Sequence, residues 1–168
     1  MKFLSRALLF LPILILLTAC PYESSVPITE ADKPIDKMLL GKWVKTDEQG
    51  SDYPSEYYQI NDLGGKLYEV MKYSINSEDS TYTNETYISH ISDLSKNGNS
   101  VKFLNMKKDG NYYLHRIDLT SDNFVLFEVT DNIDEKFDSS SELKAFVETN
   151  MHLSFFYNKD EVTFVKSN

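Results

Sequence analysis

Cysteine is almost absent from this 168-residue chain, and the single copy, Cys20, lies near the amino terminus. One thiol supplies neither an internal disulfide nor a thiolate metal or redox centre. Cohesion must therefore come from an apolar core. The chain beyond position 37, about 130 residues, is long enough for one domain that buries roughly two-thirds of its unfolded surface.

Basic residues are also in short supply. Lys and Arg number 17 against 26 Asp and Glu, which gives a formal net charge of −9 at pH 7. Nucleic acid is excluded as a partner class, because phosphate binding requires a basic face. The same charge repels an anionic lipid surface, so we expect the body of the protein to stand off a membrane.

Motifs of catalysis and cofactor binding are missing. The sequence contains no Gly-x-Ser-x-Gly elbow and no Ser-x-x-Lys motif with its companion elements. The glycine pair at 64–65 lies in a hairpin turn, not before a helix that would bind phosphate. We therefore expect neither enzyme activity nor a cofactor.

The three histidines lack the spacing of a metal site. His90, His115 and His152 show neither the His-x-x-x-His repeat of a helical zinc site nor His-x-His on a strand. His90 and His115 could still meet across a barrel beside Glu69 or Glu85. We interpret these histidines as solvated or hydrogen-bonded side chains, and we predict no metal site.

The first 19 residues contain the one long apolar run. Lys2 and Arg6 precede uninterrupted apolar residues from 7 to 17, with no acidic residue among them. This arrangement is typical of a secretory signal. Eleven residues rise only about 16 Å as a helix, well short of the roughly 20 residues that span a bilayer, so a permanent transmembrane helix is not expected.

The run ends in Leu17-Thr18-Ala19-Cys20, which resembles the lipobox of bacterial lipoproteins. In that family the chain is cut before the cysteine, whose thiol receives a diacylglyceryl group and whose new amino terminus is acylated. The resemblance implies a signal peptide over 1–19 and a mature protein that begins at lipidated Cys20. Two or three fatty chains, palmitate among them, hold a protein on a membrane for practical purposes permanently. An ordinary secretory signal with an incidental cysteine is the alternative.

The residues after Cys20 bear on location and on the tether. Pro21 and Tyr22 take the place of the aspartate that resembles an inner-membrane retention signal, so the outer membrane of a bacterial envelope is expected. Residues 20–37 include three prolines and several acids without apolar periodicity, a composition typical of an extended, poorly ordered segment. We predict a lipidated flexible tether over 20–37, with a reach of at most about 55–60 Å at roughly 3.3 Å per residue.

Without residues 1–19 the chain keeps 15 basic and 26 acidic residues, a net charge of −11. From residue 38 to 168 the composition predicts a single domain, because no repeat or second linker is present. Segments rich in Tyr, Phe, Val and Ile alternate there with turn sequences. The expected strands are 40–46, 55–61, 66–75, 82–92, 100–107, 111–119, 123–130 and 161–166.

Short turns with glycine, asparagine or aspartate separate most of these strands, as hairpins require. The pattern predicts a mainly β protein, an antiparallel meander that forms an up-and-down barrel or a strongly curved sheet. Closure into a barrel removes exposed sheet edges.

One amphipathic helix is predicted over 139–151, before the last strand. Ser139 and Glu142 have the spacing of a capping box. Four apolar residues fall on one face of this helix: Leu143, Phe146, Val147 and Met151. We expect the helix to pack on the sheet and to close one end of it.

The first strand contains a second resemblance, in the stretch LLGKWV with Gly41 and Trp43. It is similar to the Gly-x-Trp signature of lipocalins, in which the tryptophan plugs the closed end of an eight-stranded barrel. Lipocalins also carry a late-strand arginine over this tryptophan and place their helix after the eighth strand. Here Arg116 lies on the sixth predicted strand, and the helix precedes the last one. The resemblance implies a lipocalin-like barrel, and a buried structural tryptophan is the alternative.

Both faces of the predicted strands carry bulky apolar groups. In 111–119, Tyr113 and Ile117 share one face while Tyr112 and Leu114 share the other. Tyrosines in such positions line a cavity, lie on a docking surface, or belong to ordinary amphipathic surface.

Two functions follow from these alternatives. A cavity lined by aromatic rings suits a small hydrophobic or amphiphilic ligand. An exposed aromatic patch suits an envelope protein partner or an enzyme to be inhibited. Ligand binding is the function we predict, with docking without a small ligand as the alternative. The predicted wall residues are Trp43, Tyr68, Phe103, Tyr113 and Phe127.

Overall fold

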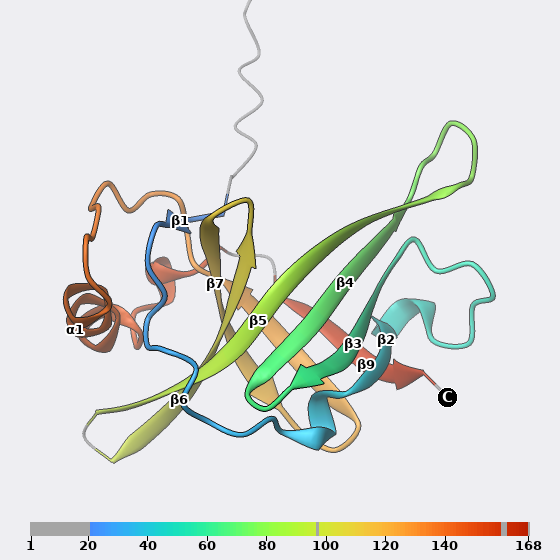
Figure 1. Ribbon diagram of the computed structural model, residues 1–168. Helices are drawn as coiled ribbons and strands as arrows, with labels where there is room; N and C mark the ends of the chain where they lie inside the picture. The colour runs from blue at the N-terminus through green and yellow to red at the C-terminus, as the bar shows by residue number, and fades with distance from the viewer. Residues whose placement is uncertain (1–20, 97, 159–160, 168) are drawn as a thin grey trace, which may run out of the picture.

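The computed structural model describes residues 21–96, 98–158 and 161–167, and its central feature is a closed antiparallel barrel (Figure 1). The eight barrel strands are β2 (Gly41–Lys45), β3 (Glu56–Gly64), β4 (Leu67–Ile75), β5 (Tyr82–Lys96), β6 (Asn99–Lys108), β7 (Asn111–Leu119), β8 (Asn123–Glu128) and β9 (Val162–Ser167). Each strand pairs with the next along the chain, and β9 pairs with β2 to close the cylinder. The prediction of an antiparallel meander that forms a barrel is confirmed.

Side chains fill one end of the barrel, where the short 3₁₀ helix η1 (Lys37–Leu39) crosses it. Trp43 is fully buried there, with its ring edge-on to Phe124 at a centroid distance of 4.8 Å. Its indole N–H donates to the Leu39 carbonyl oxygen at 2.8 Å. Further buried residues of this core are Ile60, Tyr68, Val70, Leu104, Ile117 and Phe164. This end is therefore a packed core with Trp43 at its centre.

The Gly-x-Trp spacing has a local physical reason. Gly41 has a φ of +123°, and a Cβ at this position would lie 3.2 Å from Lys166 Cε. Lys166 in turn places its ammonium 5.1 Å from the Trp43 ring centroid. Arg116 lies elsewhere, with its guanidinium 4.4 Å from the ring centroid of Phe127. A lysine on the last strand is thus the cation over the tryptophan, and glycine at position 41 suits both the positive φ and the close approach of this lysine.

The helix α1 (Ser140–Asn150) lies beside the barrel, between β8 and β9 in sequence (Figure 1). Its buried residues, Leu143 and Val147, belong to a second apolar cluster outside the barrel. That cluster includes residues of β5, β6 and β7 whose side chains alternate with the inward-facing ones: Leu94, Phe103 and Leu114. The helix and its apolar face are confirmed. The prediction that it closes one end of the sheet is wrong, because η1 and Trp43 fill that end.

Ser139 caps the start of α1, as the capping-box spacing predicts, and this cap gives a testable result. Ser139 Oγ accepts from the Glu142 backbone N–H at 3.3 Å and donates to Glu142 Oε2 at 3.0 Å. Ser139→Ala removes both bonds, so we expect the free energy of unfolding to fall by about 1 kcal/mol in chemical denaturation. Ser141→Ala, an exposed control inside the helix, should cost nothing. Equal denaturation midpoints for Ser139→Ala and wild type would contradict the capping role.

The segment 21–37 runs down the outside of the barrel, from the open end to η1 (Figure 1). It includes β1 (Glu23–Ser24), which pairs with the start of β7, where β7 extends beyond β8. Tyr22 is only 4% exposed and Ile28 is 0% exposed. The backbone N–H of Ile28 donates to the buried Asn105 side chain at 2.8 Å.

The prediction of a flexible tether over 20–37 is therefore wrong for residues 21–37. Tyr22 and Ile28 are too far apart to form a periodic pattern, yet each fills a place in the outer cluster. The fold includes the described residues from Pro21 on, and does not begin at residue 38. The predicted signal peptide over 1–19 and the lipidation site Cys20 lie outside the described residues.

Candidate functional site

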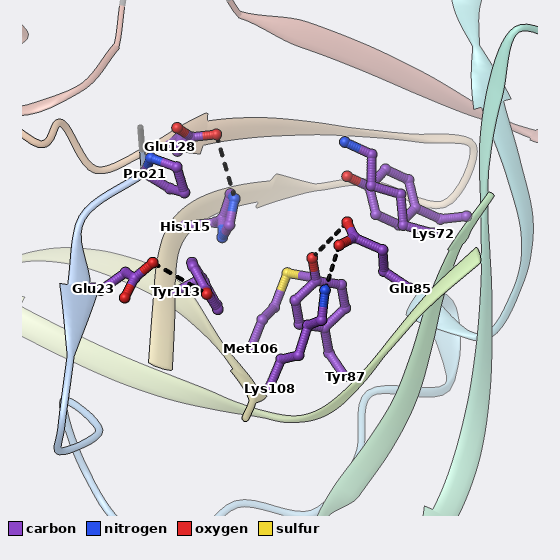
Figure 2. Close-up of a pocket in the computed structure, with 11 residues that line it drawn as sticks. Pro21, Glu23, Lys72, Glu85, Tyr87, Met106, Lys108, Tyr113, His115 and Glu128 are labelled. Atoms are coloured by element: carbon purple, nitrogen blue, oxygen red, sulfur yellow. Dashed lines mark hydrogen bonds and ion pairs between the residues drawn. The ribbon is translucent and has the colours of Figure 1, made fainter. Parts of the chain in front are cut away.

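A cavity of about 360 Å³ opens at the end of the barrel opposite η1 (Figure 2). Tyr58 and Met106 lie on its inner side, and the packed core begins beyond them. Eleven residues line it: Pro21, Glu23, Tyr58, Lys72, Glu85, Tyr87, Met106, Lys108, Tyr113, His115 and Glu128. The volume is within the lower part of the range for small-ligand sites.

Strand alternation explains why charged side chains point into this cavity. Inward-facing residues of one strand follow a period of two, so Tyr68, Val70 and Lys72 of β4 share the interior face. On β7 the same face carries Ile117 and then His115. In both strands the interior residues change from apolar to polar toward the open end. The cavity is therefore a polar mouth above an apolar plug.

One side of the mouth is electrically balanced (Figure 2). Lys108 forms an ion pair with Glu85, and this contact holds the pKa of Glu85 below its usual value. Tyr87 OH also donates to Glu85 Oε2 at 3.0 Å, while burial raises the pKa of that phenol. Lys72 Nζ lies 2.9 Å from Glu56 Oε2. Both lysines that line the cavity thus already have a carboxylate partner.

The opposite side of the mouth holds two carboxylates that form no ion pair with a lysine or arginine of the described residues, although the more distant charge of Lys72 still acts on Glu128 (Figure 2). Glu23 accepts from Tyr113 OH at 3.2 Å and from Asn111 Nδ2 at 2.9 Å. Glu128 accepts from Asn158 Nδ2 at 2.8 Å. Within the described part of the chain, neither carboxylate forms a salt bridge with a lysine or arginine. Hydrogen bonds from neutral groups only partly replace water around these charges.

His115 does not supply the missing positive charge at neutral pH. Its Nε2 lies 3.9 Å from Glu128 Oε2. Burial, together with a smaller effect of the nearby Lys72 charge, lowers the pKa of His115 to about 4. Burial raises the pKa of Glu128. The cavity wall therefore has three carboxylates against two ammonium groups, and the excess negative charge lies near Pro21.

The structure brings only one of the five predicted wall residues into this cavity. Tyr113 lines it. Trp43 and Tyr68 are buried in the core beneath it, where the Tyr68 hydroxyl accepts from the Asp36 backbone N–H.

Phe103 and Phe127 lie on the outside of the barrel. Phe103 packs in the cluster with α1, and Phe127 lies under Arg116. As wall residues these two are wrong, because their sequence neighbours Leu104 and Leu126 are the ones that face the interior. Trp43 and Tyr68 face the barrel interior, but they lie in the packed core below the cavity. The prediction that they line its wall is therefore wrong as well.

The structure does not bring His90 and His115 together across the barrel. Of the four residues considered for such a site, only His115 and Glu85 line the mouth. His90 lies outside the barrel, where its Nε2 is 2.6 Å from the Thr29 carbonyl oxygen, and Glu69 accepts from Asn61. Among the residues that the structure describes, no group of three potential ligands is arranged to hold a metal ion.

Seven mouth residues are not singled out by the sequence pattern: Glu23, Tyr58, Lys72, Tyr87, Met106, Lys108 and Glu128. One signal could have found Lys72 and Glu128. Each is a charged residue that shares the period-two face of buried apolar residues on the same strand. No comparable signal marks Glu23, because its position depends on the docking of the amino-terminal segment.

Comparisons with known proteins found no match to a family model, to a curated protein or to a solved structure. Of the helices in residues 21–96, 98–158 and 161–167, none has the length and apolar character needed to cross a membrane. The mouth geometry is therefore the main basis for a functional assignment.

Proposed function

We propose that this protein is a bacterial envelope lipoprotein that binds a small amphiphilic ligand at the barrel mouth. The lipobox resemblance supports an anchor at Cys20, with the outer membrane as the expected location. The observation that favours ligand binding is the cavity of about 360 Å³, which combines aromatic walls with uncompensated carboxylates. The packed core beneath it leaves no room for a long buried chain. Carriage of a purely hydrophobic molecule is correspondingly less supported.

The head group that fits this mouth is a cation. Glu23 and Glu128 offer negative charge, and Tyr58, Tyr87 and Tyr113 line the same cavity with phenol rings, a group that attracts ammonium ions. An alkyl group attached to the head would contact these rings and the Met106 thioether.

The connections at the open end add to this preference. Segments 46–55, 76–81, 109–110 and 131–138 contain ten acidic residues and one lysine. A cleft rimmed by charges of one sign raises the local concentration of ligands of the opposite sign. The rim therefore favours the same class of ligand as the cavity wall.

A titration of the soluble Cys20→Ser protein tests the ligand class. The probes are octyltrimethylammonium, octyl sulfate and octyl glucoside, each below its micelle concentration, followed by calorimetry. We expect the ammonium compound to bind best and Glu128→Gln to weaken it about tenfold, because the quaternary ammonium, which has no N–H to donate, then loses the charge attraction of that carboxylate. Glu69→Gln, a matched change outside the barrel, should leave the affinity unchanged. Equal affinity for all three head groups would refute a cation site.

The anchor has its own test. Cys20→Ser should move the protein from the membrane fraction to the soluble fraction in a folded form, because two or three fatty chains supply the membrane affinity. Fractionation and metabolic labelling with palmitate measure this change. Persistent membrane association of Cys20→Ser would contradict lipid anchoring.

An aromatic patch on the outside of β3, β4 and β5 favours docking as the second candidate function. Tyr57 stacks on Tyr73 at a centroid distance of 4.5 Å and meets Tyr82 edge-on at 5.4 Å. Lys42 lies 4.4 Å from the Tyr57 ring centroid. Docking predicts that Tyr57→Ser abolishes capture of one envelope protein while ammonium binding is unaffected. If Glu128→Gln abolished that capture instead, the mouth would be the docking site.

A further inference from the structure

The amino-terminal segment fixes where a lipid on Cys20 would leave the protein. Pro21, the next residue, pairs with Thr130 and lines the mouth cavity. The Tyr22 backbone N–H donates to the Val129 carbonyl oxygen at 3.2 Å, and its hydroxyl donates to the Glu135 carbonyl oxygen at 3.0 Å. Consecutive Cα atoms are about 3.8 Å apart, so position 20 is one short step from the mouth.

The residues that follow Tyr22 are also fixed to the barrel. β1 pairs Glu23 with Tyr113 and Ser24 with Tyr112, and Ile28 is buried where the segment continues toward η1. Asn105 accepts the Ile28 N–H and also donates to Ser92 Oγ at 2.9 Å. Detaching the segment would expose Tyr22 and Ile28 and leave the buried Asn105 side chain without this partner. A long stand-off from the membrane is therefore unavailable to the folded protein.

We infer that the barrel mouth faces the membrane surface, so that its cavity takes a cationic amphiphile directly from the headgroup layer. This inference rests on the proposed lipid anchor. The hairpin between β3 and β4 lies at the opposite end of the barrel, roughly 20–25 Å away for tilted strands of this length. That end points into the aqueous phase.

The acidic rim opposes close contact with anionic lipids, but this repulsion is weaker than the membrane affinity of the acyl chains. Charge repulsion between exposed groups decays over about 8–10 Å at physiological ionic strength. Each buried methylene of an acyl chain contributes about 0.8 kcal/mol, and two or three chains contain dozens of them. The anchor therefore holds the mouth at the surface, while the rim charges keep the protein body from inserting.

Two matched cysteine variants test this orientation in the full-length lipidated protein. Lys136→Cys lies beside the mouth, next to Asn111 and Glu23, and Lys66→Cys lies in the β3–β4 hairpin. Both lysines are exposed. Each variant, labelled with a small fluorophore, is placed in phosphatidylcholine vesicles that contain a nitroxide on the lipid headgroup. We expect quenching at position 136 to exceed quenching at position 66 by at least threefold.

The outcomes separate this inference from the proposed anchor. Flotation with the vesicles and the intact mass of the anchored peptide report lipidation independently of quenching. Failure to float would overturn both proposals, whereas flotation with equal quenching at positions 66 and 136 would overturn the orientation alone.

An insertion variant tests why the mouth faces the membrane. Twenty Gly and Ser residues between Cys20 and Pro21 supply about 25 Å of root-mean-square reach, so quenching at position 136 should fall toward the value at position 66. Unchanged quenching would overturn the claim that the short anchor sets the orientation.

Discussion

Replacing Trp43 with alanine lowers the free energy of unfolding by about 3–5 kcal/mol, the range typical of a large aromatic residue removed from a packed core. The indole is fully buried and touches Phe124 edge-on at 4.8 Å. Its loss leaves a void and also removes the hydrogen bond to the Leu39 carbonyl oxygen. An unpaired buried carbonyl adds its own desolvation cost. Chemical denaturation followed by tyrosine fluorescence or circular dichroism measures the change.

Two further variants separate the contributions at Trp43. Trp43→Phe keeps an aromatic ring but loses the N–H donor, so its expected cost is intermediate, about 1–3 kcal/mol. Tyr53→Ala removes a side chain that is 77% exposed, and it should change stability by less than about 0.5 kcal/mol. A Trp43→Ala loss below about 1 kcal/mol would show that the residue does not belong to the core.

Local signals in the sequence explain why the barrel could be predicted. Hairpins join neighbours in the chain, so turn residues such as those at 64–65 and 109–110 mark where one strand ends and the next begins. The signals that predict the helix are also local, because the capping residues and the apolar face lie within one short stretch. Closure between β9 and β2 joins distant strands, and it followed only from the need to remove free edges.

The candidate site was harder to predict, because it depends on which face of each strand turns inward. A shift of one residue along a strand exchanges its inward and outward faces. The prediction that Phe103 and Phe127 line the barrel interior fails for this reason. Both faces of β6 and β7 are apolar, since the barrel core covers one and the outer cluster with α1 covers the other. Composition alone cannot separate two such cores.

The amino-terminal segment shows the same limit at longer range. Its prolines and acids resemble a linker, but Tyr22 and Ile28 dock into sites built by residues about 80 to 130 positions later. The carboxylate of Glu23 reaches the mouth only through this docking. The proposed binding site therefore includes a residue of the segment that follows the proposed anchor, which the sequence of that segment alone does not indicate.

Acidification between pH 6.5 and 4 should destabilise the protein through His115 by up to roughly 3 kcal/mol. Burial lowers the pKa of His115 from 6.5 to about 4 in the folded state. The unfolded chain therefore takes up a proton in this window while the folded protein does not. The stabilisation is fully present above pH 6.5 and is lost as the pH falls toward 4.

Glu128 acts in the opposite direction. Burial raises its pKa, so the folded protein takes up that proton at a higher pH than the unfolded chain. Its protonation therefore offsets part of the loss, and the wild-type profile alone does not isolate His115. The difference between wild type and His115→Gln does, because glutamine is neutral throughout. We expect this variant to lose less stability than wild type between pH 6.5 and 4.

A second histidine provides the control for this comparison. His152→Gln makes the same chemical change at an exposed position away from the mouth. NMR titration of the His115 ring protons gives an independent reading, with a midpoint near pH 4 expected. If wild type and His115→Gln changed in parallel, the folded protein would have to protonate His115 as readily as the unfolded chain does. His115 would then be an ionic partner of Glu128 below about pH 6.5, and in that range the mouth would lose part of the negative charge on which the proposed cation binding depends.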